Sequence, residues 1–272
     1  MSQTLIFSGG GPWSLDDARY TGKSFSLNRV VGADDIDFDV SGNRAFTTDT
    51  SSRSVVQYNL STPWDIETAA SAKETTVSGG LSAQAADGMT FGTSGLSFYV
   101  VGQGKAQRYA LTSAWSVSGA TLAESVNSLA SVSAAAAIGL SSDGLKMFVV
   151  DRVPSRTIEE FALTSAFTIS ANSRLGSFDP LGINQIYGID FSSDGKTMFL
   201  LDDGNAVRQY ALVSAWSLGG ASESPTQTFN ISSQIPTVNK GGVVVTDGGR
   251  RMYITGASAG ATDDPKIFQY SL

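Results

Sequence analysis

Aromatic residues recur along this chain at an almost constant interval. Trp13, Trp64, Trp115, Phe167 and Trp216 follow one another at spacings of 51, 51, 52 and 49 residues. This series contains all 4 tryptophans of the chain, so the spacing is not a chance feature. Self-similarity with a period of roughly 20–50 residues is typical of solenoids and propellers, in which each copy is one supersecondary unit. We therefore predict five copies of one structural unit.

Two further positions repeat with the same period. The first is a turn glycine after a short apolar segment, and its copies are Gly42, Gly95, Gly144, Gly195 and Gly248. The second is an aromatic residue in the third segment of each unit, and its copies are Tyr58, Tyr109, Phe161, Tyr210 and Tyr270. Both series support the same division of the chain into five units.

Each unit has the pattern of four strands, seen most clearly from residue 188 onward. The first strand (189–192) ends in a Ser-x-Asp-Gly turn, where Asp can bond its own backbone and Gly can adopt a positive φ. The second (198–201) is apolar on both faces, and the third alternates around Tyr210. The fourth is more polar, as an outer strand should be, and is expected at 74–78, 124–129, 174–178 and 226–231. Such a sheet cannot bury both faces alone, so the sheets must stack radially.

The two chain ends indicate how the ring closes. The chain stops after a third strand at Leu272, whereas Pro12–Ala18 matches Pro63–Ala69. Residues 20–28 would then supply the missing fourth strand. We predict an all-β, five-bladed β-propeller over residues 12–272, with four antiparallel strands per blade and closure by the N- and C-terminal strands. Residues 1–11 would form a separate N-terminal strand or arm, since Thr4–Ser8 resembles a spare third strand.

Composition narrows the chemistry that is open to this fold. The chain has no Cys and no His, which removes thiolate and imidazole nucleophiles, bases and metal ligands. A net charge of -7 without a basic cluster disfavours nucleic acid as a partner. No apolar run approaches the ~18 residues of a membrane span, and no signal peptide is visible. We expect no cofactor, no metal, no catalytic residue and no membrane insertion.

The repeat resembles one found in bacteriophage and bacterial proteins. The resemblance is carried by Phe-Ser-x-Asp-Gly-x-x-Met-Phe (191–199) and by Val-x-Gln-Tyr-x-Leu-Ser-Thr-Pro-Trp-Asp-Ile-x-Thr-Ala (55–69). More loosely, the unit resembles the YVTN-type surface-protein repeat. In phages the first repeat occurs in virion and tail-fibre-like proteins. The resemblance implies a non-enzymatic virion structural protein, decorating the particle, associated with its tail or fibre-like. Its propeller would be an interaction platform for other virion proteins or for attachment to the host surface.

Acidic residues in the predicted loops are the main candidates for a ligand site. The connections expected around one mouth of the central channel carry Asp34, Asp35, Asp49, Asp87, Asp151, Asp202, Asp203 and Asp263. Equivalent positions in the five units read Asp34, Asp87, Ala136, Tyr187 and Lys240, so no complete acidic ring is expected. The main interpretation is solvated loop carboxylates; a cation site and an acid–base pair acting on a glycan are the alternatives. The candidate ligand-binding residues are Asp34, Asp87, Asp151, Asp202 and Asp203.

The remaining candidates are the repeat aromatics and one acidic stretch. Trp13, Trp64, Trp115 and Trp216 are interpreted as inter-blade packing residues. The alternative is a ring of sugar-stacking platforms, which would make the protein a carbohydrate-binding lectin-type propeller with a host-surface glycan as partner. A carboxylate-based glycan-active enzyme is the third hypothesis. Asp35–Asp39 superficially matches a calcium loop but lacks the required Gly and Glu, and we assign it to a strand.

Overall fold

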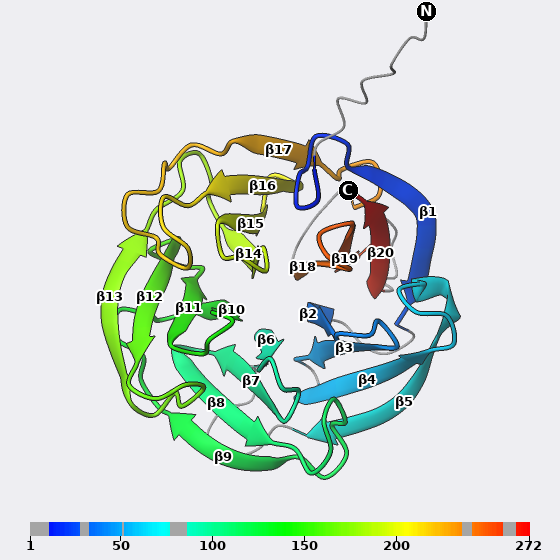
Figure 1. Ribbon diagram of the computed structural model, residues 1–272, viewed down its shortest axis with the longest axis horizontal. Helices are drawn as coiled ribbons and strands as arrows, with labels where there is room; N and C mark the ends of the chain where they lie inside the picture. The colour runs from blue at the N-terminus through cyan, green and yellow to red at the C-terminus, as the bar shows by residue number, and fades with distance from the viewer. Residues whose placement is uncertain (1–10, 28–32, 51, 77–85, 236–240, 258–264) are drawn as a thin grey trace, which may run out of the picture.

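The chain forms a ring of five β-sheets arranged around a central axis (Figure 1). A computed structural model describes residues 11–27, 33–50, 52–76, 86–235, 241–257 and 265–272. Within these ranges there are twenty strands and one short 3-10 helix, η1 (Ile66–Thr68). Every sheet has four antiparallel strands, ordered from an inner first strand to an outer fourth strand. The predicted five-bladed β-propeller is confirmed.

The blades follow the chain order, apart from the last one. Blade 1 contains β2 (Ala33–Phe38), β3 (Arg44–Asp49), β4 (Ser54–Leu60) and β5 (Ala69–Thr76). Blade 2 contains β6 (Gly88–Phe91), β7 (Ser97–Gly102), β8 (Lys105–Ala110) and β9 (Thr121–Val126). Blade 3 contains β10 (Ala135–Leu140), β11 (Lys146–Asp151), β12 (Thr157–Leu163) and β13 (Asn172–Phe178). Blade 4 contains β14 (Ile186–Phe191), β15 (Thr197–Asp202), β16 (Ala206–Ala211) and β17 (Gln227–Asn230). Blade 5 contains β18 (Val243–Thr246), β19 (Arg251–Ala257), β20 (Pro265–Ser271) and β1 (Arg19–Ser26).

Blade 5 joins the two ends of the described chain. The N-terminal strand β1 pairs antiparallel with β20, with Tyr20 opposite Tyr270 and Phe25 opposite Ile267. The register shifts between Tyr20 and Ser24. Closure by strands from both termini is therefore confirmed, and no blade is left with an open end. The spare strand predicted at Thr4–Ser8 lies outside the described residues and stays a prediction.

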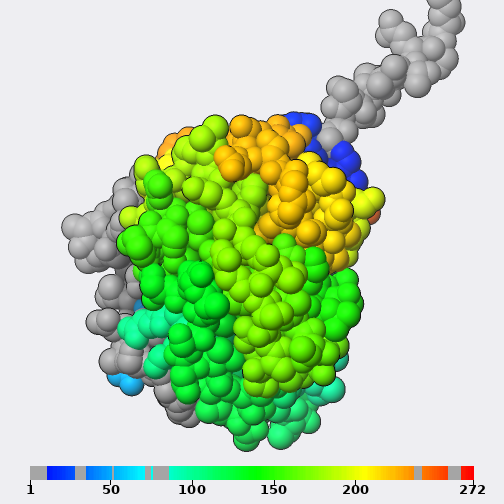
Figure 2. Space-filling model, turned by 90° about the vertical axis from the view of Figure 1, so that its left-hand side faces the viewer, coloured from blue at the N-terminus to red at the C-terminus, as the bar shows by residue number. Residues whose placement is uncertain are grey.

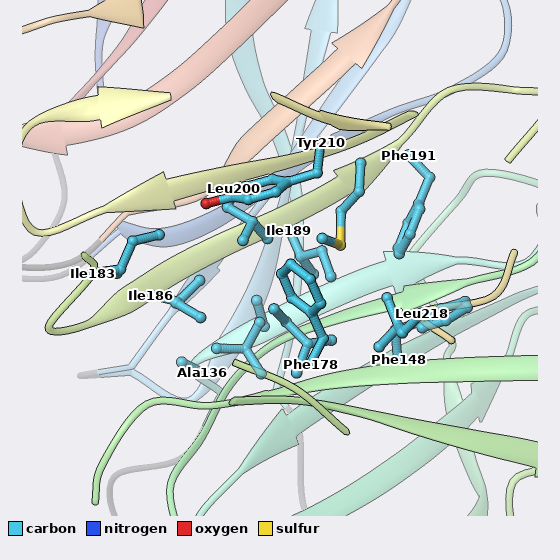
Figure 3. Packing of buried hydrophobic residues seen from close by; sticks show 14 of the residues in the cluster. Ala136, Phe148, Phe178, Ile183, Ile186, Ile189, Phe191, Leu200, Tyr210 and Leu218 are labelled. Carbon is cyan, nitrogen blue, oxygen red and sulfur yellow. The ribbon is translucent and has the colours of Figure 1, made fainter. Parts of the chain in front are cut away.

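Apolar side chains of adjacent blades form the cores between them. Between blades 3 and 4, Phe148 and Phe178 pack with Ile189, Leu200 and Tyr210 (Figure 3). All five side chains are almost completely buried. Seen from the side, these blades form one continuous outer wall without an intervening gap (Figure 2). The second strands, predicted to be apolar on both faces, are covered on both sides by neighbouring blades.

The repeat aromatics occupy a turn of unusual backbone geometry. In all five units the residue has a left-handed conformation, with φ between 56 and 68° for Trp13, Trp64, Trp115, Phe167 and Trp216. Its backbone N–H donates to the carbonyl of the turn glycine that follows the first strand, and its ring lies against that glycine. In blade 5 the glycine beneath Trp13 is Gly249, not Gly248 as predicted, because two glycines stand side by side in that turn.

A polar contact connects each blade to the aromatic turn of the next blade. An oxygen of a third-strand side chain accepts the backbone N–H two residues after the aromatic. The pairs are Gln57 with Val117 at 3.3 Å, Glu160 with Leu218 at 2.8 Å, Gln209 with Leu15 at 3.0 Å and Gln269 with Ile66 at 3.1 Å. From blade 2 to blade 3, Arg108 holds Glu124, which accepts from Ser170 N at 2.8 Å. We call these five contacts the inter-blade latches.

Candidate functional site

The inner strands β2, β6, β10, β14 and β18 surround a narrow axial cavity of about 60 Å³. One residue of each strand occupies the equivalent cavity-lining position: Asp37, Thr90, Gly139, Asp190 and Val244. The strands approach so closely that several positions exclude a side chain. A Cβ on Gly88 would lie 2.5 Å from the Cα of Ala137, and one on Gly188 would lie 2.8 Å from the N of Val243. Glycine is required there because of this backbone contact.

Three carboxyl groups lie in this cavity, and each contacts two strands. Asp35 Oδ1 accepts the N–H of Ile36 at 2.9 Å, while its Oδ2 accepts that of Met89 in blade 2 at 2.7 Å. Asp37 Oδ2 accepts the N–H of Phe91 in blade 2 at 3.0 Å, and its Oδ1 accepts that of Phe38. These two carboxyls therefore connect blade 1 to blade 2.

Asp190 makes the equivalent connection between blades 4 and 5. Its Oδ2 accepts the N–H of Val245 at 2.6 Å, as Asp37 accepts that of Phe91 at the same position of the next inner strand. Each inner strand is the edge of its sheet, so its backbone N–H groups on the axial side have no acceptor in a neighbouring strand. The carboxyl oxygens of Asp35, Asp37 and Asp190 accept hydrogen bonds from some of these N–H groups instead.

The axial carboxyls are hard to ionise. Burial raises the pKa of Asp35 well above its usual range, raises that of Asp37 to about 6 and raises that of Asp190 to about 8. The backbone hydrogen bonds lower each pKa, but the neighbouring carboxylates raise it again. Among the described residues that line the cavity there is no Lys or Arg. Carboxyl groups with a shifted pKa that lie in a cavity are ordinarily candidates for a functional site.

The size of the cavity and the use of the oxygens limit what this group can do. A volume of about 60 Å³ holds a few water molecules, whereas ligand pockets typically measure about 300–1,000 Å³. The carboxyl oxygens already accept backbone N–H groups, as a structural role requires. Among the described residues, no three Asp or Glu side chains are placed to hold one metal ion.

The predicted loop carboxylates lie elsewhere, and for those that are buried the expectation of solvation is wrong. Asp49, Asp151 and Asp202 end the second strands of blades 1, 3 and 4, and all three are buried. Each accepts hydrogen bonds from an adjacent loop: Asp151 from Ala134 N at 2.7 Å, for example. Asp202 also forms an ion pair with Arg208 at 2.5 Å. The free-energy cost of burying these carboxylates is offset because the donors replace their hydrogen bonds to water.

The other predicted residues are placed as follows. Asp87 is buried beside β6, and half-buried Asp203 accepts from Asn184 N at 3.3 Å. Asp34 belongs to the backbone of β2, but its side chain is outside the described part, as is the whole of Asp263. Asp35 was grouped with the loop carboxylates at the channel mouth, whereas the stretch 35–39 was assigned to a strand; Asp35 lies inside β2 and lines the cavity.

Sequence reasoning did not single out Asp37 and Asp190 as site residues. A signal was available, because the tripeptide Ile-Asp-Phe occurs at the first strand of both units, at 36–38 and 189–191. A carboxyl between two core residues of an inner strand must point to the opposite face from them. In a propeller blade, that alternation directs it toward the axis or toward the next blade.

The repeat tryptophans are half-buried in equivalent environments. As equivalent packing positions would require, all four fall between buried and exposed. One face of each ring lies on its turn glycine, and phenylalanines of the first strands contact the rings of Trp64, Trp115 and Trp216 at centroid distances of 5.0–5.7 Å. These contacts are those of packing residues, while part of each ring remains open to solvent.

Comparison with known proteins returns solved structures of low sequence identity. No family model and no curated protein sequence matches the chain. Among solved structures, it is similar to the β-propeller domain of Cps50 (Swd1) from Myceliophteria thermophila, with 11% identity, a TM-score of 0.47, and coverage of 90% of this chain and 72% of the other. It is also similar to a 6-phosphogluconolactonase candidate from Bacteroides fragilis, with 12% identity, a TM-score of 0.48, and coverage of 72% and 54%.

Helices contribute almost nothing to the described ranges. No helix there has the length and hydrophobicity needed to cross a membrane.

Proposed function

We propose that this protein is a non-enzymatic structural protein of a phage particle, in which the propeller is a rigid platform for assembly or for attachment to the host surface. The observation that carries the proposal is the repeated aromatic turn. Five equivalent turns present partly exposed aromatic residues on the same side of the ring of blades, together with the turns after the first strands. We call this side the turn face. The assignment to a phage particle rests on the resemblance of the repeat to those of virion proteins.

Exposed apolar residues on the turn face support a protein partner. Val40, Leu96 and Leu145 lie in turns after first strands, and Val213 lies in the turn before Trp216. Val40 is 75% exposed and Val213 is 74% exposed, the two highest values among the large apolar residues that the structure describes as exposed. An apolar residue repeated in the turns of four blades offers a protein partner several equivalent contacts.

The positions and hydrogen-bond partners of the carboxyl groups support a non-catalytic role. Glycan hydrolysis needs two carboxyls on either side of a substrate bond, with room for a sugar between them. The axial carboxyls instead hold backbone N–H groups in a cavity too small for a sugar. The buried loop carboxylates Asp151 and Asp202 organise their own loops.

The proposal can be tested with particles assembled without this protein. Purified protein should co-sediment with such particles, and Val40→Ser with Val213→Ser should weaken that association. Leu175→Ser is a matched control, because Leu175 is 56% exposed but lies on outer strand β13, away from the turn face. Failure of the wild-type protein to attach to particles would overturn the virion assignment. Equal weakening by the control would overturn the choice of face.

Glycan binding at the rings is a second candidate, favoured by the solvent-open part of each tryptophan. Its test is a glycan array followed by titration of intrinsic fluorescence. Trp115→Phe is a suitable variant, because Phe167 occupies the same position in blade 3. A bound glycan whose affinity falls in Trp115→Phe would support this second function, whereas an array without any binding would exclude it for the sugars tested.

A further inference from the structure

The junctions around the axis are not all built alike. Asp35 and Asp37 connect blade 1 to blade 2, and Asp190 connects blade 4 to blade 5, through hydrogen bonds to backbone N–H groups. Inner strands also meet directly, between blades 2 and 3, where Gly88 approaches Ala137, and between blades 4 and 5, where Gly188 approaches Val243. At the axis, the described hydrogen bonds therefore involve an ionisable side chain at two of the five junctions.

Among the described residues, no side chain of opposite charge lines the axis. The five inner strands contribute the residues around the carboxyls, and the charged side chains among these described lining residues are Asp35, Asp37 and Asp190. Each lies within electrostatic range of another: Asp37 and Asp190 both act on Asp35, and Asp39, at the end of β2, also acts on Asp37. Ionisation of all three would place like charges in a confined space of low polarity, which is unfavourable.

We propose that the three axial carboxyls form a proton-dependent clasp, which holds the junctions between blades 1 and 2 and between blades 4 and 5 firmly in mildly acidic solution and loosens them as the solution becomes alkaline. A protonated carboxyl still offers its carbonyl oxygen to the N–H of the next blade. Its proton can be shared with a neighbouring carboxyl or with water in the cavity. The neutral carboxyl therefore keeps its hydrogen bond to the next blade and does not repel the other carboxyls.

The direction of the pH effect follows from the raised pKa values. An unfolded aspartate loses its proton near pH 3.8, whereas Asp37 keeps it to about pH 6 and Asp190 to about pH 8. Between these limits the folded state binds more protons than the unfolded state, so stability falls as pH rises. For each group the unfolding constant increases up to about tenfold per pH unit within its own window, and is constant above it.

The first test is urea unfolding of the whole chain at pH 5, 6, 7, 8 and 9. The wild type should be most stable at the acidic end of this range. Asp190→Asn and Asp37→Asn keep an oxygen that can accept the N–H and carry no charge, so each should flatten the curve within the window of the group removed. Asp143→Asn is the control: Asp143 is an exposed turn residue whose pKa is lowered, so it titrates below this range and its removal should leave the slope unchanged.

A second measurement localises the effect and remains informative if one variant does not fold. Hydrogen exchange, corrected for the intrinsic effect of pH, should show the wild-type amide of Phe91 losing protection as the pH rises through about 6, and that of Val245 as it rises through about 8. The amide of Trp64, which donates to Gly42 within one blade, should not change. Parallel stability curves for the wild type and both Asn variants would overturn the clasp. Uniform loss of protection across the ring would overturn its assignment to two junctions.

Discussion

The aromatic turn should tolerate no side chain on the glycine beneath the ring. Gly95 has φ +68°, and a Cβ there would overlap the indole of Trp115, whose backbone N–H donates to the Gly95 carbonyl at 2.8 Å. Gly95→Ala therefore costs about 1–2 kcal/mol for a left-handed alanine, plus about 1–3 kcal/mol for overpacking. Gly22→Ala separates the two costs: Gly22 has φ +86° with nothing within 4 Å of the added Cβ, so only the backbone cost applies.

Urea unfolding monitored by circular dichroism measures this difference. We expect Gly95→Ala to lose about 2–5 kcal/mol and Gly22→Ala about 1–2 kcal/mol. In a chain of this size, each kcal/mol lowers the melting temperature by roughly 2 °C. Once Trp115→Ala has removed the ring, the alanine at position 95 should cost no more than the one at position 22. Equal losses in the two single variants would refute the clash, and additive losses in the double variant would show that the ring is not its cause.

Three further predictions concern the latches, the rings and the chain end. Gln269→Leu should cost about 1–3 kcal/mol because the buried N–H of Ile66 loses its acceptor, whereas Gln269→Glu keeps an oxygen and should cost less in the same urea assay. Trp115→Phe should cost under about 2 kcal/mol, and a larger loss would show that blade 3 does not share the packing of blade 2. Deletion of residues 1–9 should leave the melting temperature of the ring unchanged, since β1 begins at Arg19; unfolding would place a structural strand within the deleted segment.

The spacing of the aromatics was enough to predict the number of blades and the place of closure. Both follow from a constraint that the sequence records directly: every unit must bury the same faces, so the same residue types return at the same interval. Boundaries were predicted less well, and β5 begins at Ala69 rather than Glu74. A polar outer strand shows where its exposed face lies but gives little indication of where pairing begins.

The direction of the acidic side chains could not be predicted in the same way. Asp49, Asp151 and Asp202 follow apolar strands, and an exposed loop would be their usual place. Their burial depends on backbone N–H groups of neighbouring loops, those of Ser52 for Asp49, Ala206 for Asp202 and Ala134 for Asp151. Every residue type except proline carries such a donor, so these contacts leave no periodic trace in the sequence. For Asp37, alternation shows that it leaves the core face, but the presence of a cavity rather than solvent on the other side is a property of the closed ring.

Because β1 and β20 come from opposite chain ends, blade 5 has the largest sequence separation between its strands. It nevertheless makes the same kind of contacts with its neighbours as the other blades do. Leu15 N donates to Gln209 in blade 4 as Ile66 N donates to Gln269 in blade 5, so latches of one kind bracket blade 5 on both sides. Leu15 N also donates to the side-chain oxygen of Gln227 at 2.8 Å, a second acceptor that comes from outer strand β17 of blade 4. An open repeat array needs capping units at its ends because its terminal units have one uncovered face. Here β1 and β20 remove the ends, so every blade can carry the same aromatic turn and none needs to be modified as a cap.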